Sequence, residues 1–322
     1  MVEPLVEIKE VKVYFPSKSK LYAKSKSVVK AVDDVSFSIR QGETLGLVGE
    51  SGCGKSTTGR AVMQLLKPTS GEISFAGRKL SSLSVSELRQ ERKHFQMVFQ
   101  DPFSSLNPRL TVKEILDEPL KAHRIGSAQE RWGRIRHIME VCGLNHNYAS
   151  RYAHEFSGGQ RQRIGIARAL ILHPQLVVAD EPVSALDVSI QSQILNLMQD
   201  LQEEFQLTYL FISHDLGVVR HICDRVGVMY LGRMAELATT EELFANPLHP
   251  YTKTLLSAIP VPDPRLRKDR IILQGDVPSP INPPQGCAFS GRCPNAMEIC
   301  KESRPRMLNV TGEHSVACHL YG

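Results

Sequence analysis

The order of hydrophobic and polar positions predicts β-structure before residue 50. Residues 5–15 alternate apolar with charged side chains, and this period of two is typical of a half-buried strand. Residues 31–49 contain two short apolar runs separated by Gln41 and Gly42, a pair that favours a turn. The chain should therefore begin with three strands.

Beyond residue 50 the pattern becomes helical and later alternates between helix and strand. Helical spacing predicts helices over 54–66, 127–144, 160–172, 188–205 and 215–223, and apolar runs predict strands over 175–180 and 207–213. Alternating strands and helices are typical of a parallel sheet covered by helices, so the predicted fold class is α/β. The helical patterns between about 101 and 170 indicate a helical subdomain.

Proline becomes frequent past about residue 240, which favours extended, irregular structure over another wound sheet. At 322 residues the chain exceeds the roughly 250 to 300 residues at which one core usually stops growing. We expect a main domain over residues 1–240 and a Pro-rich extension over residues 241–322.

Composition and charge narrow the class of protein. The chain has 42% hydrophobic residues but no apolar run near the ~20 residues that cross a bilayer, and its start shows no secretory signal. A reducing cytoplasm is then the default compartment. The net charge of +5 is too modest to argue for nucleic acid. The Lys- and Ser-rich residues 17–30 read as a solvated hairpin loop, with contact to anionic lipid or nucleic acid as the alternative.

The first chemical motif, "GESGCGKST", lies between an apolar run and a helix and matches the phosphate loop G-x-x-x-x-G-K-[ST]. Its glycines let several N–H groups face one anion, at the positive end of the following helix. A glycine-rich turn without phosphate would give the lysine and hydroxyl positions no rationale. We expect Lys55 at the β- and γ-phosphates, Ser56 at Mg²⁺, and a lowered thiol pKa at Cys53. The nucleotide-binding residues of the loop are Gly49, Glu50, Ser51, Gly52, Cys53, Gly54, Lys55, Ser56 and Thr57.

A second motif, "QLVVADEP", places Asp180 and Glu181 directly after four apolar residues. A buried strand would deliver both carboxylates at its C-terminal end, where α/β sheets bind ligands. Asp180 would hold Mg²⁺ through water, and Glu181 would polarise the attacking water. Adjacent acids at a strand end are often a surface feature, but here they follow a phosphate loop.

With these motifs the chain resembles the ATP-binding subunits of ABC transporters over residues 5–240. The resemblance rests on "FSGGQRQR", on the "SALD" loop, on "FISHDL" and on "MVFQDP". It implies an ABC-type P-loop NTPase with a RecA-like parallel core, an N-terminal antiparallel β subdomain and a helical subdomain. It also implies that the following residues act on ATP: Gln100, Ser157, Gly158, Gly159, Gln160, Asp187 and His214.

The same resemblance assigns a mechanism to these residues. Two subunits would pair head to tail, and ATP would lie between the phosphate loop of one and the Ser157–Gln160 signature of the other. Glu181, His214, Gln100 and Lys55 would be catalytic, with Gln100 also near Mg²⁺. The adenine would stack on Phe15, or alternatively on Tyr14.

Four cysteines gather near the C-terminus: Cys287, Cys293, Cys300 and Cys318. Their spacing, C-x₅-C-x₆-C-x₁₇-C, is wider than the C-x₂-C pairs of zinc fingers. The surrounding segment resembles the C-terminal extension of oligopeptide and dipeptide importer ATPases, especially the second ATPase subunit, which implies a structural [4Fe–4S] cluster. Zinc is the first alternative, and disulfides or free thiols are the second.

The expected function is therefore that of the energy-coupling ATPase of a peptide importer, using ATP and Mg²⁺. The resemblance implies a paralogous second ATPase subunit as heterodimer partner, two transmembrane permease subunits, and indirect action with an extracytoplasmic peptide-binding protein. The chain would lie peripherally on the cytoplasmic face of the inner membrane and bind no nucleic acid. Alternatives are an importer of nickel or another small solute, and a soluble ABC ATPase outside transport.

Overall fold

The computed structural model describes residues 3–16, 28–259, 271–273, 275–276, 278–281 and 283–322. The chain folds into two compact units. Unit 1 contains the chain up to Ile39, then Thr44–Ser81 and Ser213–Gly322, and unit 2 contains Arg40–Glu43 and Ser82–Ile212. Most of the lysine-rich segment lies outside the described residues, so both interpretations of residues 17–30 stay open.

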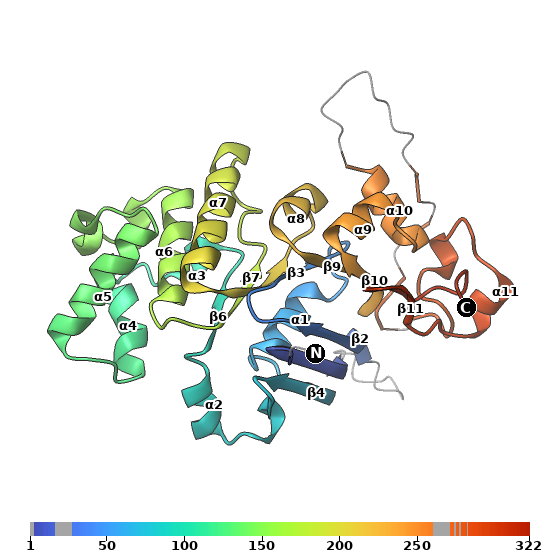
Figure 1. Ribbon diagram of the computed structural model, residues 1–322, viewed down its shortest axis with the longest axis horizontal. Helices are drawn as coiled ribbons and strands as arrows, with labels where there is room; N and C mark the ends of the chain where they lie inside the picture. The colour runs from blue at the N-terminus through green and yellow to red at the C-terminus, as the bar shows by residue number, and fades with distance from the viewer. Residues whose placement is uncertain (1–2, 17–27, 260–270, 274, 277, 282) are drawn as a thin grey trace, which may run out of the picture. The chain divides into compact units, whose positions relative to one another are not determined.

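Unit 1 contains an antiparallel sheet with the strand order β2-β1-β4-β5 (Figure 1). Its strands are β1 (Val6–Pro16), β2 (Val28–Ile39), β4 (Ser70–Phe75) and β5 (Arg78–Lys79). Val6, Ile8, Val11 and Val13 are all buried, as the alternating pattern of residues 5–15 predicts. The N-terminal antiparallel part of the expected fold is therefore confirmed.

A second group of strands in unit 1 surrounds the phosphate-loop motif. Strand β3 (Thr44–Val48) pairs in parallel with β9 (Arg225–Tyr230), and β10 (Arg233–Thr239) pairs antiparallel with β9. All five residues of β3 are buried, as expected for a strand covered on both faces. Although a Gln-Gly turn lies between β2 and β3, as predicted, the two strands belong to different sheets. Helix α1 (Lys55–Val62) follows β3, and α8 (Leu216–Ile222) precedes β9.

Unit 2 contains three parallel strands in the order β8-β7-β6 and most of the helices. The strands are β6 (Phe95–Val98), β7 (Leu176–Asp180) and β8 (Thr208–Ile212). The helices are α2 (Val85–Glu91), α3 (Pro102–Ser105), α4 (Val112–Ala122), α5 (Ala128–Val141), α6 (Gly158–Leu170) and α7 (Val188–Phe205). The predicted helices and strands of this unit are confirmed to within a few residues. The short β6 was not predicted, because four residues within a charged stretch show no clear period.

Helix starts in unit 2 follow a common local rule. Helices α2, α4, α5 and α6 each begin after a Ser or Thr whose side-chain oxygen accepts a hydrogen bond from the backbone N–H three residues later. The Glu or Gln at that later position accepts in turn from the backbone N–H of the Ser or Thr. This reciprocal capping satisfies backbone N–H groups that the helix itself leaves unbonded. The capping residues are Ser84, Thr111, Ser127 and Ser157.

The Pro-rich extension is more ordered than its composition predicts. It contains α9 (Thr240–Ala245), α10 (Pro250–Ser257), α11 (Glu298–Glu302), β11 (Leu308–Thr311) and β12 (His314–Val316). Strand β12 pairs with β10 and β11 pairs with β12, so these residues extend an existing sheet. The prediction of irregular structure was wrong for these helices and strands, whereas no separate wound sheet is formed by the described residues of the extension. Proline is compatible with this order because Pro250 opens α10, where no backbone N–H is needed.

A buried carboxylate fixes the extension to β10. Glu236 is 0% exposed and accepts hydrogen bonds from the backbone N–H groups of Leu248 and His249. His314 of β12 lies 2.7 Å from Glu236 through its Nε2. Buried charge is costly unless it is bonded in this way. The pairing of β10 with β12 therefore has both backbone and side-chain support.

Burial of His249 makes the stability of unit 1 pH-dependent. His249 caps α10 through its Nδ1, which accepts from the Tyr251 N–H at 3.0 Å, and burial lowers its pKa to about 4, against about 6.5 in an unfolded chain. Between these values the unfolded chain binds a proton that the folded chain does not, so stability falls as pH falls. We expect up to about 3 kcal/mol of this loss to come from His249.

The measurement is Tm against pH from 7 to 4, for the parent and for His249→Asn, which can cap the helix without titrating. The parent Tm should fall more steeply than the variant Tm below pH 6.5. Parallel profiles would exclude His249 as the source.

Candidate nucleotide site

The phosphate-loop motif forms a tight turn between β3 and α1. Gly49 and Gly54 have φ values of 148° and 103°. A Cβ on Gly49 would lie 2.2 Å from the Met229 carbonyl oxygen, and one on Gly54 would lie 2.2 Å from that of Ala31. Both positions therefore require glycine, since a side chain would enter neighbouring backbone as well as strain its own.

The side chain of Lys55 is hydrogen-bonded to the backbone of this loop. Its side chain is buried, and its Nζ donates to the backbone carbonyls of Gly49 at 2.8 Å and of Glu50 at 3.2 Å. Helix α1 begins at Lys55 after a glycine N-cap, and a helix start of this kind directs N–H groups and positive potential at an anion. The loop thus combines a fixed cation with backbone donors, which suits a phosphate chain.

The expectation of a low thiol pKa at Cys53 was wrong. Burial raises the pKa of Cys53 and outweighs the charge of Lys55, which acts in the opposite direction. The residue is only 4% exposed. Neighbours in the sequence suggested an activated thiol, but the fold removes the water that would stabilise a thiolate.

The two candidate adenine-stacking residues lie in different surroundings. The Tyr14 hydroxyl donates a hydrogen bond to Asp33. The pKa of Tyr14 is raised to about 12, mainly because the side chain is partly buried and secondly because of this hydrogen bond. Burial alone would raise the pKa of Asp33, but hydrogen bonds from Tyr14 and Arg233 lower it overall. Phe15 is 37% exposed. The aromatic face of Phe15 is therefore the more accessible of the two.

In unit 2 the structure brings Glu181 and Gln100 together. Asp180 is the last residue of β7 and is 2% exposed. Glu181 follows with a φ of 47°, and its carboxylate accepts a hydrogen bond from Gln100 Nε2 at 2.8 Å. A left-handed glutamate is a backbone strain of the type found at functional sites.

The signature residues occupy the start of α6. Ser157 is exposed and caps the helix, and its backbone N–H donates to Gln160 Oε1 at 3.1 Å. A Cβ on Gly159 would lie 2.6 Å from Ile190 Cγ2. Asp187 is exposed at the N-cap of α7. Helix α6 begins at Gly158, and Gly158 and Gly159 are both partly exposed at its positive end. His214, in unit 1, is exposed as well.

Sequence analysis missed two side chains that contact the phosphate loop. Arg292 donates to both carboxylate oxygens of Glu50, and the Tyr251 hydroxyl accepts from the Glu50 N–H at 2.8 Å. The arginine is 242 positions from its partner. Because Arg292 lies between two cysteines, its sequence surroundings predict a metal site, and no local pattern predicts contact with the phosphate loop.

The four C-terminal cysteines lie within electrostatic reach of one another. Burial raises the pKa of Cys287, Cys293 and Cys318, and the charges of other cysteines in the group, including Cys300, raise it further. The backbone N–H of Cys287 donates to the Cys300 carbonyl at 2.8 Å, and the described cysteines are all free thiols. Within the part of the chain that the structure describes, however, no three His, Cys, Asp or Glu side chains are grouped to hold a metal. The donor types fit a metal centre, but their arrangement does not.

Comparisons with known proteins agree with the motifs. A family model described as ABC transporter matches residues 32–184, and one described as oligopeptide/dipeptide transporter, C-terminal region, matches residues 235–300. The oligopeptide transport ATP-binding protein AppF of Bacillus subtilis is 58% identical over 99% of this chain and 98% of its own. OppF of Escherichia coli, with the same description, is 53% identical over 98% and 95%.

A solved structure supports the fold. The dimeric, post-hydrolysis ATP-binding cassette MJ0796 bound to ADP and phosphate matches with a TM-score of 0.65 and 31% identity, over 73% of this chain and 98% of that one. The phosphate loop, the adjacent carboxylates Asp180 and Glu181 and the signature at the start of α6 are together typical of a nucleotide-hydrolysing P-loop protein. More particularly, the chain belongs to the ABC transporter ATP-binding proteins, and it is an ABC-type ATPase. The predicted α/β fold class and family are thereby confirmed.

Proposed function

We propose that this chain is the ATP-hydrolysing, energy-coupling subunit of a membrane importer for oligopeptides or dipeptides. The observation that carries the proposal is the match over nearly the whole chain to oligopeptide transport ATP-binding proteins, at 58% and 53% identity. The match of residues 235–300 to the peptide-transporter C-terminal region favours peptides over nickel or another small solute. We assign residues 1–240 to the ATP-binding domain and residues 241–322 to the extension.

Individual residues receive roles in ATP binding and hydrolysis. Lys55 binds the β- and γ-phosphates, and Ser56 and Asp180 hold Mg²⁺ with the help of Gln100. Glu181 polarises the attacking water, while His214 and Asp187 respond to the γ-phosphate. Phe15 stacks on adenine, and its exposure supports this choice over Tyr14, whose hydroxyl is bonded to Asp33.

ATP acts as part of a subunit interface in this proposal. A second ATPase subunit, a paralogue, offers its signature helix start to the nucleotide held by the phosphate loop, and cleavage of the γ-phosphate removes contacts and reopens the pair. Two permease subunits carry the peptide across the membrane from an extracytoplasmic binding protein. No described helix of this chain is long and apolar enough to span a bilayer, and we place the chain on the cytoplasmic face of the membrane.

Co-purification from membranes tests the assembly. The tagged chain, extracted in mild detergent, should bring a second ATPase and two permease subunits, and peptide-loaded binding protein should stimulate ATP hydrolysis by the complex. A complex stimulated by nickel-loaded and not by peptide-loaded binding protein would reject peptides as substrate. Recovery of a cytosolic complex without permeases would reject transport.

The cysteines Cys287, Cys293, Cys300 and Cys318 are proposed to hold a [4Fe–4S] cluster, with Zn²⁺ as the alternative. Support comes from donor chemistry alone, since four thiols suit either centre, although no three of them are grouped around one point in the described part of the chain. Such a centre would stabilise the extension, because the free energy of metal binding adds to that of folding.

Metal content decides between these occupants. Anaerobically purified chain should contain about four iron and four sulfide per subunit, and Cys293→Ser should lose them together with part of the thermal stability. About one zinc per chain without sulfide would select the alternative. A chain free of metal, with unchanged Tm in Cys293→Ser, would reject both.

A further inference from the structure

The C-terminal extension contacts the phosphate loop through a partly buried ion pair. Arg292 lies at the end of a short 3₁₀ turn (Ser290–Arg292), and its guanidinium contacts Glu50 with two parallel hydrogen bonds, 2.8 Å from Nη1 to Oε2 and 3.2 Å from Nη2 to Oε1. The side chains of Arg292 and Glu50 are 11% and 28% exposed. Two-pronged pairs of this kind fix geometry as well as charge.

The partner, Glu50, is bonded through three separate groups. Its carboxylate accepts from Arg292, its N–H donates to the Tyr251 hydroxyl, and its carbonyl accepts from Lys55 Nζ. Glu50 is the second residue of the loop, directly after Gly49. The position of its peptide therefore influences both the turn and the lysine that the loop presents to phosphate.

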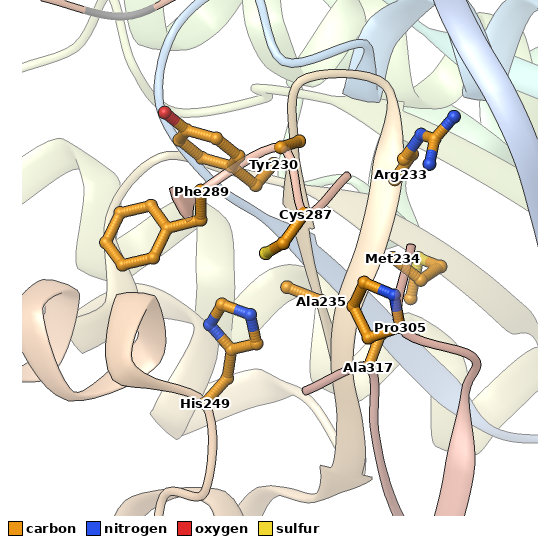
Figure 2. Close-up of a pocket in the computed structure, with 10 residues that line it drawn as sticks. Tyr230, Arg233, Met234, Ala235, His249, Cys287, Phe289, Pro305 and Ala317 are labelled. Atoms are coloured by element: carbon orange, nitrogen blue, oxygen red, sulfur yellow. The ribbon is translucent and has the colours of Figure 1, made fainter. Parts of the chain in front are cut away.

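An aromatic cluster holds Arg292 in place. Phe289, three residues earlier, is buried against Tyr230 and Tyr251, with ring centroids 5.2 Å and 5.4 Å away. Figure 2 shows Phe289 beside Tyr230. Its carbonyl accepts from the Arg292 N–H at 2.9 Å. The Tyr230 hydroxyl also lies 3.4 Å from Arg292 Nη1. The hydrogen bond with Glu50 is the largest cause of a raised pKa at Arg292, so the guanidinium remains charged.

The extension contacts the neighbouring strand β2 as well. The Lys30 N–H donates to the Pro280 carbonyl at 3.0 Å, and Arg304 lies 3.6 Å from the Asp33 carboxylate. Asp33 is the residue to which Tyr14 donates. Pro280, Arg292 and Arg304 therefore contact two parts of unit 1 that carry nucleotide-binding candidates.

We propose that Arg292 is a positioning residue for MgATP, contributed by the C-terminal extension, which holds Glu50 and thereby sets the phosphate loop in its binding conformation. The proposal rests on the assignment of the Gly49–Thr57 loop to ATP. It goes beyond that assignment because it makes the extension part of nucleotide binding. Arg292 acts through Glu50 and does not itself touch the reacting atoms.

Kinetics of the assembled complex test the role. Arg292→Ala should raise the KM for MgATP roughly tenfold while kcat changes by less than about twofold, and Arg292→Lys should recover only part of the affinity because it lacks the fork geometry. Arg306→Ala, an exposed arginine of the same extension, is the matched control and should leave KM unchanged. An unchanged KM in Arg292→Ala would overturn the proposal.

A double-mutant cycle separates positioning from general stability. Glu50→Gln should raise KM by a similar factor, and the double variant with Arg292→Ala should be no worse than either single variant, because both changes remove one interaction. If the increases in KM of the two single variants added up in the double variant, the proposal would be overturned. It would also be overturned if Arg292→Ala lowered Tm and reduced kcat by the same factor by which it raised KM, because this would indicate a general loss of structure. If the parent itself binds no MgATP, the ATPase assignment fails instead, so the two failures are distinguishable.

Discussion

The Glu181→Gln variant is expected to bind MgATP as the parent does and to hydrolyse it at least about 100-fold more slowly. The amide keeps the size of the side chain and can still bond Gln100, which lies 2.8 Å from the carboxylate, but it cannot accept a proton from water. Because the γ-phosphate is retained, the variant should accumulate as an ATP-bound pair of subunits. Phosphate release measures the rate, and size-exclusion chromatography with and without MgATP measures the association.

Glu203→Gln is the matched control for this change. Glu203 is an exposed glutamate of α7 in the same unit, and its replacement removes the same charge without altering turnover. Hydrolysis by Glu181→Gln at the parental rate would show that the base is misassigned. Loss of ATP-dependent association in the slow variant would reject the proposal that nucleotide joins two subunits.

Sequence reasoning succeeded where local pattern and local chemistry coincide. Helix α7 has the bounds 188–205 that its periodicity predicts, and β7 ends at Asp180 as its apolar run predicts. The phosphate loop was recognisable because its glycines, lysine and hydroxyls have fixed spacing, and the structure explains Gly49 and Gly54 by backbone oxygens 2.2 Å from any added Cβ. Such features depend on residues close in the chain.

It failed where the cause lies far away in the sequence. The thiol pKa of Cys53 follows from burial under the rest of unit 1, whereas its sequence neighbours suggested the opposite. Strands β11 and β12 are too short to show a period and exist because β10 offers an edge to pair with. The Arg292–Glu50 pair joins positions 242 residues apart, so it could only be found once the extension was placed against the loop.

Replacing Gly54 with alanine should weaken MgATP binding by about 100-fold. A left-handed φ costs an L-residue roughly 1–2 kcal/mol, and forcing backbone apart costs about 1–3 kcal/mol more. At Gly54 both apply, because φ is 103° and the new Cβ would lie 2.2 Å from the Ala31 carbonyl oxygen. The loop can relieve this contact only by moving its peptide groups away from the phosphate. The dissociation constant of a fluorescent ATP analogue measures the loss.

Gly77→Ala separates these two causes. Gly77 has a similar φ of 74°, lies in the turn between β4 and β5, and has open space where a Cβ would stand. It therefore carries the conformational cost without the collision, and its variant should lose some stability but keep the parental affinity for nucleotide. Parental affinity in Gly54→Ala would mean that the loop adopts a different turn when it binds ATP. Equal losses in both variants would mean that affinity follows general stability, and the contact between Gly54 and the strand beside it would then have no specific part in binding.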